Sequence, residues 1–184
     1  MKRNILKNAV GHFMTVTRHR HAVIRHARKA GILWQGITHD LSKYSLEEFI
    51  PGVKYYMGDR SPNEMERETF GYSSAWLHHK GRNKHHFEHW TDYNPKERRV
   101  MPVKMPVRYV AEMFCDRVAA SKIYQGDKYA DSHPYEYFDK GRDRRFIDTE
   151  TSKLLESWLI ILRDKGEKEA FSCIKEAVRR SKKH

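Results

Sequence analysis

A histidine, an aspartate and a lysine lie within five residues of one another, as His39, Asp40 and Lys43. An imidazole and a carboxylate can bind the same divalent metal ion. A lysine one helical turn further along can reach an anion bound to that metal. Such a pair also occurs by chance, so it indicates a metal site only when further ligands accompany it.

The chain contains twelve histidines in 184 residues, more than solubility requires. Most of them fall into two clusters, one before and one after the His-Asp pair. The clusters comprise His12, His19, His21, His26, His78, His79, His85, His86 and His89. This density is what a metal site with several ligands needs.

The region before the pair has the pattern of one long helix. Residues 4–30 contain no proline. His12, Val16, His19, Val23 and His26 are spaced by four and three residues, which places them on one helical face. The glycine at position 31 is expected to end this helix.

The rest of the chain is also predicted to be helical. Residues 32–38 are expected to form a short link, and a helix is expected from Ser45 to about residue 58, with Ser45 as N-cap and Glu48 completing a capping box. A turn over 59–63 precedes a helix over 64–79, in which Gly71 is a weak point, and 81–83 is a loop. Residues 94–106 are expected to be irregular.

Three further helices are predicted towards the C-terminus, over 107–124, 148–163 and 168–181. Residues 125–145 read as a connection with one short helix. No alternation typical of strands is evident. The expected fold is therefore all-α, a single multi-helix domain over 1–184, with the site in about 12–125 and the C-terminal helices in about 147–182.

The helix predicted over 107–124 is apolar on nearly every side, yet it contains Asp116. A buried carboxylate needs a partner, because desolvating an unpaired charge costs several kcal/mol. A metal ion would meet that need. A salt bridge to Arg108, Arg117 or a lysine from elsewhere is the alternative.

Composition favours a packed globular protein. Hydrophobic residues make up 39%, aromatic residues 12% and charged residues of mixed sign 33%. No run of 18 apolar residues occurs, and residues 1–5 lack the features of a signal peptide. Cys115 and Cys173 are far apart, which favours two reduced core thiols. We therefore expect a cytoplasmic protein without a membrane partner.

The net charge of +12 favours anionic partners such as nucleotides, nucleic acid or phosphorylated metabolites. The lysines and arginines are spread along the chain, except for a basic tail over 179–183. A basic protein with no such partner is the alternative.

The positions of His19, the His39 and Asp40 pair, Lys43 and the distant Asp116 resemble the HD-domain superfamily. Its members are all-α metal-dependent phosphohydrolases, with a minority of di-iron oxygenases. Residues 75–86 are also similar to a segment of an uncharacterised HD-like family of bacterial and phage proteins, domain of unknown function 5662. The resemblance covers about residues 12–125.

The resemblance implies a particular set of ligands. The first metal ion would bind His19, His39, Asp40 and Asp116. A second ion, bridged by Asp40, would bind His79 and either His85 or His86. The chain departs from the usual pattern, because Ser42 replaces a common glycine and the first histidine lies only twenty residues before the pair. The second departure leaves His21 as an alternative to His19. His78 is likewise an alternative to His79.

The expected function is metal-dependent hydrolysis of a phosphate ester, a nucleotide or another phosphorylated small molecule, by a metal-activated water. One or two divalent transition metal ions, Mn, Fe, Co, Ni or Zn, would be the cofactor. Asp40 and Lys43 would be catalytic, with Lys43 neutralising charge on the phosphate. Arg82 and Asn83 adjoin the implied ligands and are candidates for substrate binding.

Two other functions are compatible with the sequence. The first is a di-iron oxygenase, which the histidine-rich ligand set also resembles. The second is a basic helical module that binds nucleic acid without catalysis, which the basic tail motivates.

Overall fold

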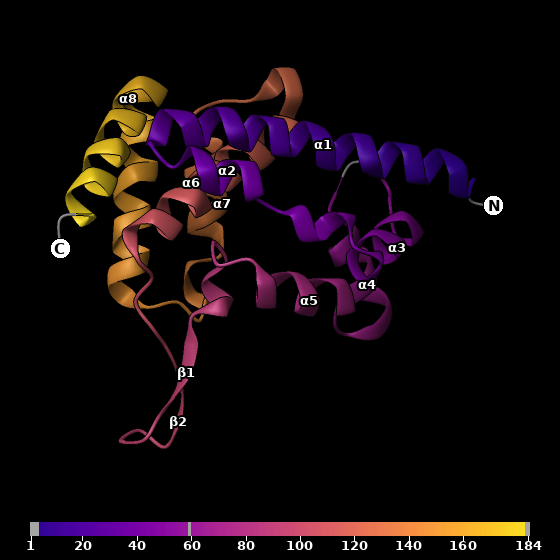
Figure 1. The fold of residues 1–184 in the computed structure, drawn as a ribbon, viewed down its shortest axis with the longest axis horizontal. Coiled ribbons are helices and arrows are strands. Elements are labelled where there is room, and N and C mark those ends of the chain that lie inside the picture. Colours follow the sequence, from indigo (N-terminus) through magenta and orange to yellow (C-terminus); the bar gives the residue numbers. More distant parts are fainter. Residues whose placement is uncertain (1–3, 59, 183–184) are drawn as a thin grey trace.

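The computed structural model describes residues 4–58 and 60–182, and these are mostly helical (Figure 1). The all-α prediction is therefore confirmed. Predictions that fall on residues 1–3, on Asp59 in the expected turn and on Lys183 in the basic tail lie outside the described residues.

The elements follow one another along the chain with short connections. The α-helices are α1 (Ile5–Ala30), α2 (Leu33–Thr38), α3 (Leu46–Lys54), α4 (Pro62–Phe70), α5 (Ser74–Arg82), α6 (Val107–Gln125), α7 (His133–Lys140) and α8 (Thr149–Ser181). Short 3-10 turns lie at Leu41–Tyr44, Phe87–His89, Gly126–Lys128 and Arg142–Arg144. The strands are β1 (Thr91–Asn94) and β2 (Arg99–Pro102).

The long helix α1 forms as its sequence predicts. The side chain of Asn4 accepts a hydrogen bond from the Lys7 N–H at its start, and Gly31 ends it in the left-handed conformation, with φ 76°. The predicted face, which includes His12, His19 and His26, is buried. This face packs against α2, α3, α6 and α8.

The core lies where α6 is covered by α1, α7 and α8 (Figure 1). Its largest fully buried apolar side chains are Phe114, Phe138, Leu155, Leu159, Leu162 and Ile174. At Gly166, φ is 79° and ψ is 176°, which interrupts α8 between the two helices predicted over 148–163 and 168–181. α6 is therefore buried along much of its length, and it carries the carboxylates of Glu112 and Asp116.

Several local predictions were wrong. The expected link over 32–38 contains α2, and the single helix over 64–79 is two helices, because Gly71 ends α4 with φ 79°. Ser45 does precede α3, but its side chain makes no capping hydrogen bond, and Glu48 turns to histidines instead.

The segment expected to be irregular over 94–106 contains part of a small hairpin. Its strands β1 and β2 are antiparallel, with Thr91 opposite Pro102 and Asn94 opposite Arg99. The hairpin projects from the helical body (Figure 1). The sequence did not predict this hairpin, because strands of four residues are too short to show a clear alternation of apolar and polar residues.

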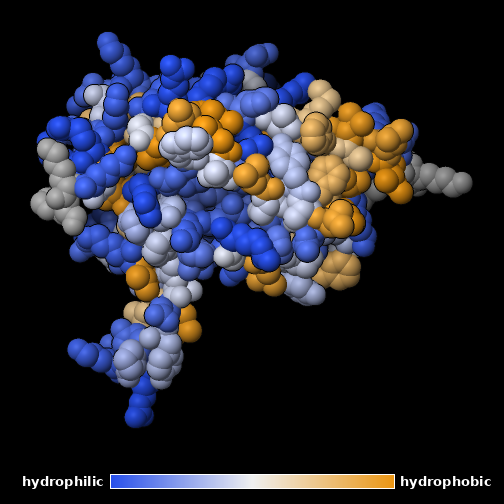
Figure 2. Space-filling view, viewed as in Figure 1, coloured by the Kyte–Doolittle hydropathy of each residue, from blue (hydrophilic) through white to orange (hydrophobic). Residues whose placement is uncertain are grey.

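One end of the molecule exposes apolar side chains. They lie where α1 begins, and Figure 2 shows apolar surface gathered there. Ile5 and Leu6 are 74% and 75% exposed. Within residues 4–58 and 60–182, no helix combines the length and the apolar character needed to cross a bilayer.

Gly36 allows α2 to lie directly on α1. A Cβ atom at this position would lie 2.4 Å from the Cβ of Ala27 and 3.3 Å from the Cα of Ile24. We therefore expect Gly36→Ala to lower the free energy of unfolding by about 1–3 kcal/mol, because overpacking outweighs the better helix propensity. Chemical denaturation would measure this loss.

Gly81→Ala in α5 is the matched control, because a Cβ there meets nothing within 4 Å. It should leave stability unchanged or raise it by up to about 1 kcal/mol. Equal stabilities of the two variants would contradict the close approach of α2 to α1.

Candidate metal centre

The His39 and Asp40 pair occupies the turn that follows α2. Asp40 has φ 53°, a left-handed conformation that few residues other than glycine adopt. Arg20 of α1 donates hydrogen bonds to the carbonyls of His39, at 2.8 Å, and Ile37, at 2.7 Å. The turn is thereby held against α1, and each residue of the pair is 1% exposed.

A first group of donor atoms comes from α1, this turn and α6. Nε2 of His19 lies 2.9 Å from Oδ1 of Asp116. Nε2 of His39 lies 3.7 Å from the same oxygen and 3.3 Å from Oδ2 of Asp40. One atom from each of these four residues lies within 4.8 Å of the others.

A second group shares Asp40 and adds three histidines from α5 and the loop after it. Nε2 of His79 lies 3.2 Å from Oδ1 of Asp40, and Nε2 of His85 lies 3.5 Å from it. His86 completes the group, again within 4.8 Å. Asp40 therefore presents Oδ2 to the first group and Oδ1 to the second.

The donor atoms fit divalent transition metals by distance and chemistry. Two ligands at right angles, each about 2.1 Å from an ion, are about 3.0 Å apart. Although the atoms are this close, several are buried without a hydrogen-bond partner among the described residues. Of these, Nε2 of His19 and Oδ2 of Asp40 face charged partners, Asp116 and Lys43, at 2.9 and 2.7 Å. Those without a charge partner closer than 3.2 Å are Nε2 of His39, His85 and His86 and Oδ1 of Asp40. Leaving such groups unpaired is costly, and shared ions would satisfy them.

Two buried glutamates orient the histidines from the opposite side of their rings. Oε1 of Glu112 lies 3.0 Å from Nδ1 of His39 and 3.2 Å from Nδ1 of His85. Oε2 of Glu48 lies 2.7 Å from Nδ1 of His79. An Nδ1–H that donates to a carboxylate leaves Nε2 free for a metal ion.

Sequence reasoning missed this role of both glutamates. The sequence predicts Glu48 as part of a capping box and assigns no role to Glu112. A signal existed for Glu112, since it lies four residues before Asp116 in the same apolar helix and so on the same face. No comparable signal connects Glu48 with the histidines of α5.

The acidic groups are held in the ionised form that binds metal. Burial opposes ionisation of Glu112, but hydrogen bonds from His39 and His85 lower its pKa to about 2. Burial likewise opposes ionisation of Asp116, and contacts with His19 and His39 nonetheless hold its pKa well below the usual value. For His86, burial moves the pKa well below the usual value, which favours the neutral imidazole.

Lys43 lies beside the donor atoms. Its Nζ is 2.7 Å from Oδ2 of Asp40, and its side chain is 30% exposed. Burial tends to lower the pKa of Lys43, but the carboxylates of Asp40 and Asp116 outweigh it and raise the pKa. The ammonium therefore stays charged at neutral pH and remains partly accessible.

The other two predicted substrate-binding residues differ in position. Asn83 is engaged within the protein, because its amide donates to Ser42 Oγ and to the His79 carbonyl, both at 2.8 Å. Arg82 is exposed at the end of α5, and the structure does not bring it to the donor atoms.

The remaining histidines of the two clusters lie elsewhere. His12 packs against Phe49 and Tyr56, and His26 stacks on Phe171. His21 is exposed, and His78 contacts Glu48 through Nδ1. Some histidines of the two clusters therefore pack in the interior or lie on the surface and do not contribute to the donor groups.

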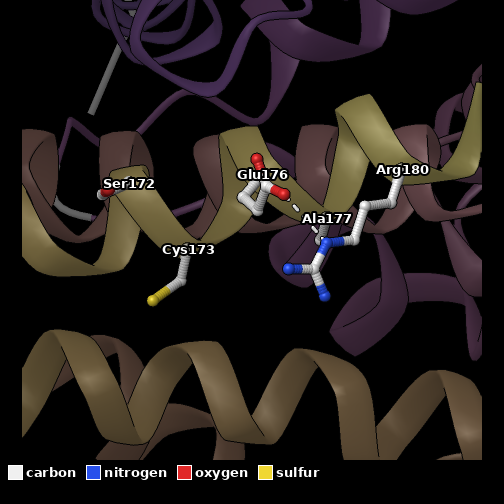
Figure 3. A pocket seen from close by; sticks show the side chains of 5 residues that line it. All are labelled: Ser172, Cys173, Glu176, Ala177 and Arg180. Atoms are coloured by element: carbon white, nitrogen blue, oxygen red, sulfur yellow. Dashed lines mark hydrogen bonds and ion pairs between the residues drawn. The ribbon is translucent and has the colours of Figure 1, made fainter.

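A separate hollow of about 430 Å³ lies on α8 (Figure 3). It is lined by Ser172, Cys173, Glu176, Ala177 and Arg180. None of these residues belongs to the donor groups. Of the two cysteines, Cys115 is buried in the core as predicted, whereas Cys173 is only half-buried at this hollow.

The fold and the site together define an all-α protein with a candidate metal centre of histidines and carboxylates. The chain matches the family described as "Family of unknown function (DUF5662)" over residues 8–160. It belongs to that family. No curated protein and no solved structure matches the chain.

Proposed function

We propose that the protein is a metal-dependent phosphohydrolase that acts on a nucleotide or another phosphate ester. The observation that supports this most strongly is the sharing of Asp40 between two groups of donor atoms. His19, His39, Asp40 and Asp116 would hold one divalent ion, and Asp40, His79, His85 and His86 the other. The resemblance to the HD-domain superfamily agrees with this proposal.

When bound, such ions supply Lewis acidity and make hydroxide available near neutral pH. Residues of the chain position the ions and the substrate. Asp40 fixes the spacing of the two positions, and Glu112 and Glu48 orient the imidazoles. Lys43 places a positive charge beside Asp40, where it can neutralise phosphoryl oxygens.

The proposal is tested by phosphate release from nucleotides and an aryl phosphate with Mn²⁺, Co²⁺ or Ni²⁺. We expect turnover with at least one of these ions and none after chelation. Lys43→Met should lower kcat/KM about 100-fold while the protein still binds metal, because a charge that contacts the reacting phosphate is lost.

Lys153→Met removes the same charge from an exposed position of α8 and serves as the control. It should retain the wild-type kcat/KM. Equal losses in the two variants would mean that only net charge matters, and Lys43 would have no specific role.

The second candidate is a di-iron oxygenase, and the five histidines of the two donor groups favour it. The same ligands would then hold iron. Iron in protein purified without oxygen, together with oxygen uptake in the presence of organic substrates and no phosphate release, would support this function over hydrolysis.

A further inference from the structure

Glu112 lies between the two donor groups and contacts one imidazole from each. The same oxygen, Oε1, is 3.0 Å from Nδ1 of His39 and 3.2 Å from Nδ1 of His85. The rings of these two histidines are 4.3 Å apart between centroids. A single buried carboxylate oxygen therefore connects a residue of the first group with a residue of the second.

The other carboxylate oxygen of Glu112 is also held. Nε2 of Gln35, in α2, donates to Oε2 at 2.9 Å. Glu112 as a whole is 6% exposed. The carboxylate cannot rotate away from one imidazole without losing the other and the amide of Gln35, so its orientation is fixed from three sides.

Glu48 offers an instructive contrast. It too is 6% exposed and contacts histidines through Nδ1. Its partners are His79, which belongs to the second group only, and His78, which belongs to neither. The two glutamates therefore differ in how many metal positions they reach.

We propose that Glu112 is a positioning residue shared by both metal positions, so that its substitution weakens both at once. This inference rests on the metal-dependent function proposed above. By accepting from Nδ1–H of both imidazoles, Glu112 fixes their tautomers and directs both Nε2 atoms to the ions. Because one oxygen serves both rings, a change of orientation at one is transmitted to the other.

The test is a calorimetric titration of the metal-free full chain with Mn²⁺ alone, without substrate. The wild type should bind two ions. In Glu112→Gln the negative charge that both Nδ1–H groups face is lost. An amide that keeps its carbonyl on the imidazoles turns its NH2 to Gln35, whose own amide must then flip and give up its hydrogen bond to the Arg108 carbonyl. Both affinities should therefore fall about 10–100-fold. Glu48→Gln should weaken one position only.

A rescue variant separates positioning from mere loss of structure. In the double variant Gln35→Glu with Glu112→Gln, the new amide can donate to the carboxylate at position 35 and turn its carbonyl to both imidazoles. Part of both affinities should return. If Glu112→Gln does not fold, Gln35→Ala provides the second measurement, and it should weaken both positions by a smaller factor.

The outcomes separate this inference from the proposed function. A folded Glu112→Gln that loses one position or neither overturns the shared role. A wild type that binds no Mn²⁺ overturns both the role and the metal-dependent function. If Glu112→Gln weakens Mn²⁺ binding at both positions but the wild type releases no phosphate, the role of Glu112 is supported. Only the proposed hydrolase activity is then contradicted.

Discussion

Asp40→Asn is expected to weaken metal binding strongly at both positions. The substitution keeps the shape of the side chain but removes the charge that both donor groups share through Oδ1 and Oδ2. We expect Mn²⁺ affinity to fall at least about 100-fold at both positions, and phosphate release to fall at least about 1,000-fold. Titration with Mn²⁺ and single-substrate kinetics measure the two effects.

Asp116→Asn is the informative comparison, because Asp116 belongs to the first group alone. It should remove one ion and leave the second. Asp143→Asn, at an exposed position, controls for the loss of one negative charge. If Asp40→Asn retained one ion at wild-type affinity, the carboxylate would not be shared and the two-ion arrangement would be wrong.

Metal-free protein is expected to lose stability as the pH falls from about 6.5 to about 4. Burial, followed by the nearby charge of Lys122, lowers the pKa of His26 from 6.5 to about 4 in the folded state. Burial and Lys43 lower the pKa of His12 similarly, to about 4. Between these pH values the unfolded chain binds more protons than the folded chain, so acid favours unfolding. Each residue contributes up to about 3 kcal/mol.

His19 and His86 act in the same direction within this window, because burial lowers the pKa of both imidazoles. The next groups act mainly outside it. The pKa of His39 is raised in the fold, since the carboxylates around it outweigh its burial, and its contribution is fully present below 6.5. The carboxylates of Glu112 and Glu167 have a pKa of about 2 in the fold, against an ordinary value of 4.5, so protonation of the unfolded chain costs stability at lower pH.

Urea unfolding at pH 7, 6 and 5 would measure this dependence. His26→Leu should show a shallower loss of stability with acid, because a leucine cannot be protonated. The ring of His26 faces Phe171 and the Cys115 carbonyl, with Lys29, Lys122 and Glu167 nearby, so leucine would fill an enclosed site. His21→Leu, on the exposed side of α1, should keep the wild-type slope. Equal slopes in both variants would contradict the account of His26.

Local patterns predicted the residues whose roles depend on one element. The four and three spacing of His12, His19 and His26 fixed their common face on α1, and the apolar surroundings of Asp116 indicated a buried carboxylate in need of a partner. The structure shows that this carboxylate faces His19 and His39, although its side chain is only partly buried, at 20% exposed.

Features that depend on contacts between distant elements could not be predicted. Glu48 fits the start of α3 equally well as a capping residue, and only the packing of α3 on α5 brings it to His79. The resemblance implies one of His85 and His86 beside Asp40, and only the turn of the chain after α5 shows that both reach it. The six residues of α2 are too few for a clear helical period, so that helix was missed.

Diffraction from a crystal grown with Mn²⁺, recorded at the manganese absorption edge, tests the central claim most directly. The account predicts two anomalous peaks, one on each side of the Asp40 carboxylate, the first near His19 and Asp116 and the second near His79, His85 and His86. A map without an anomalous peak beside Asp40 would contradict it.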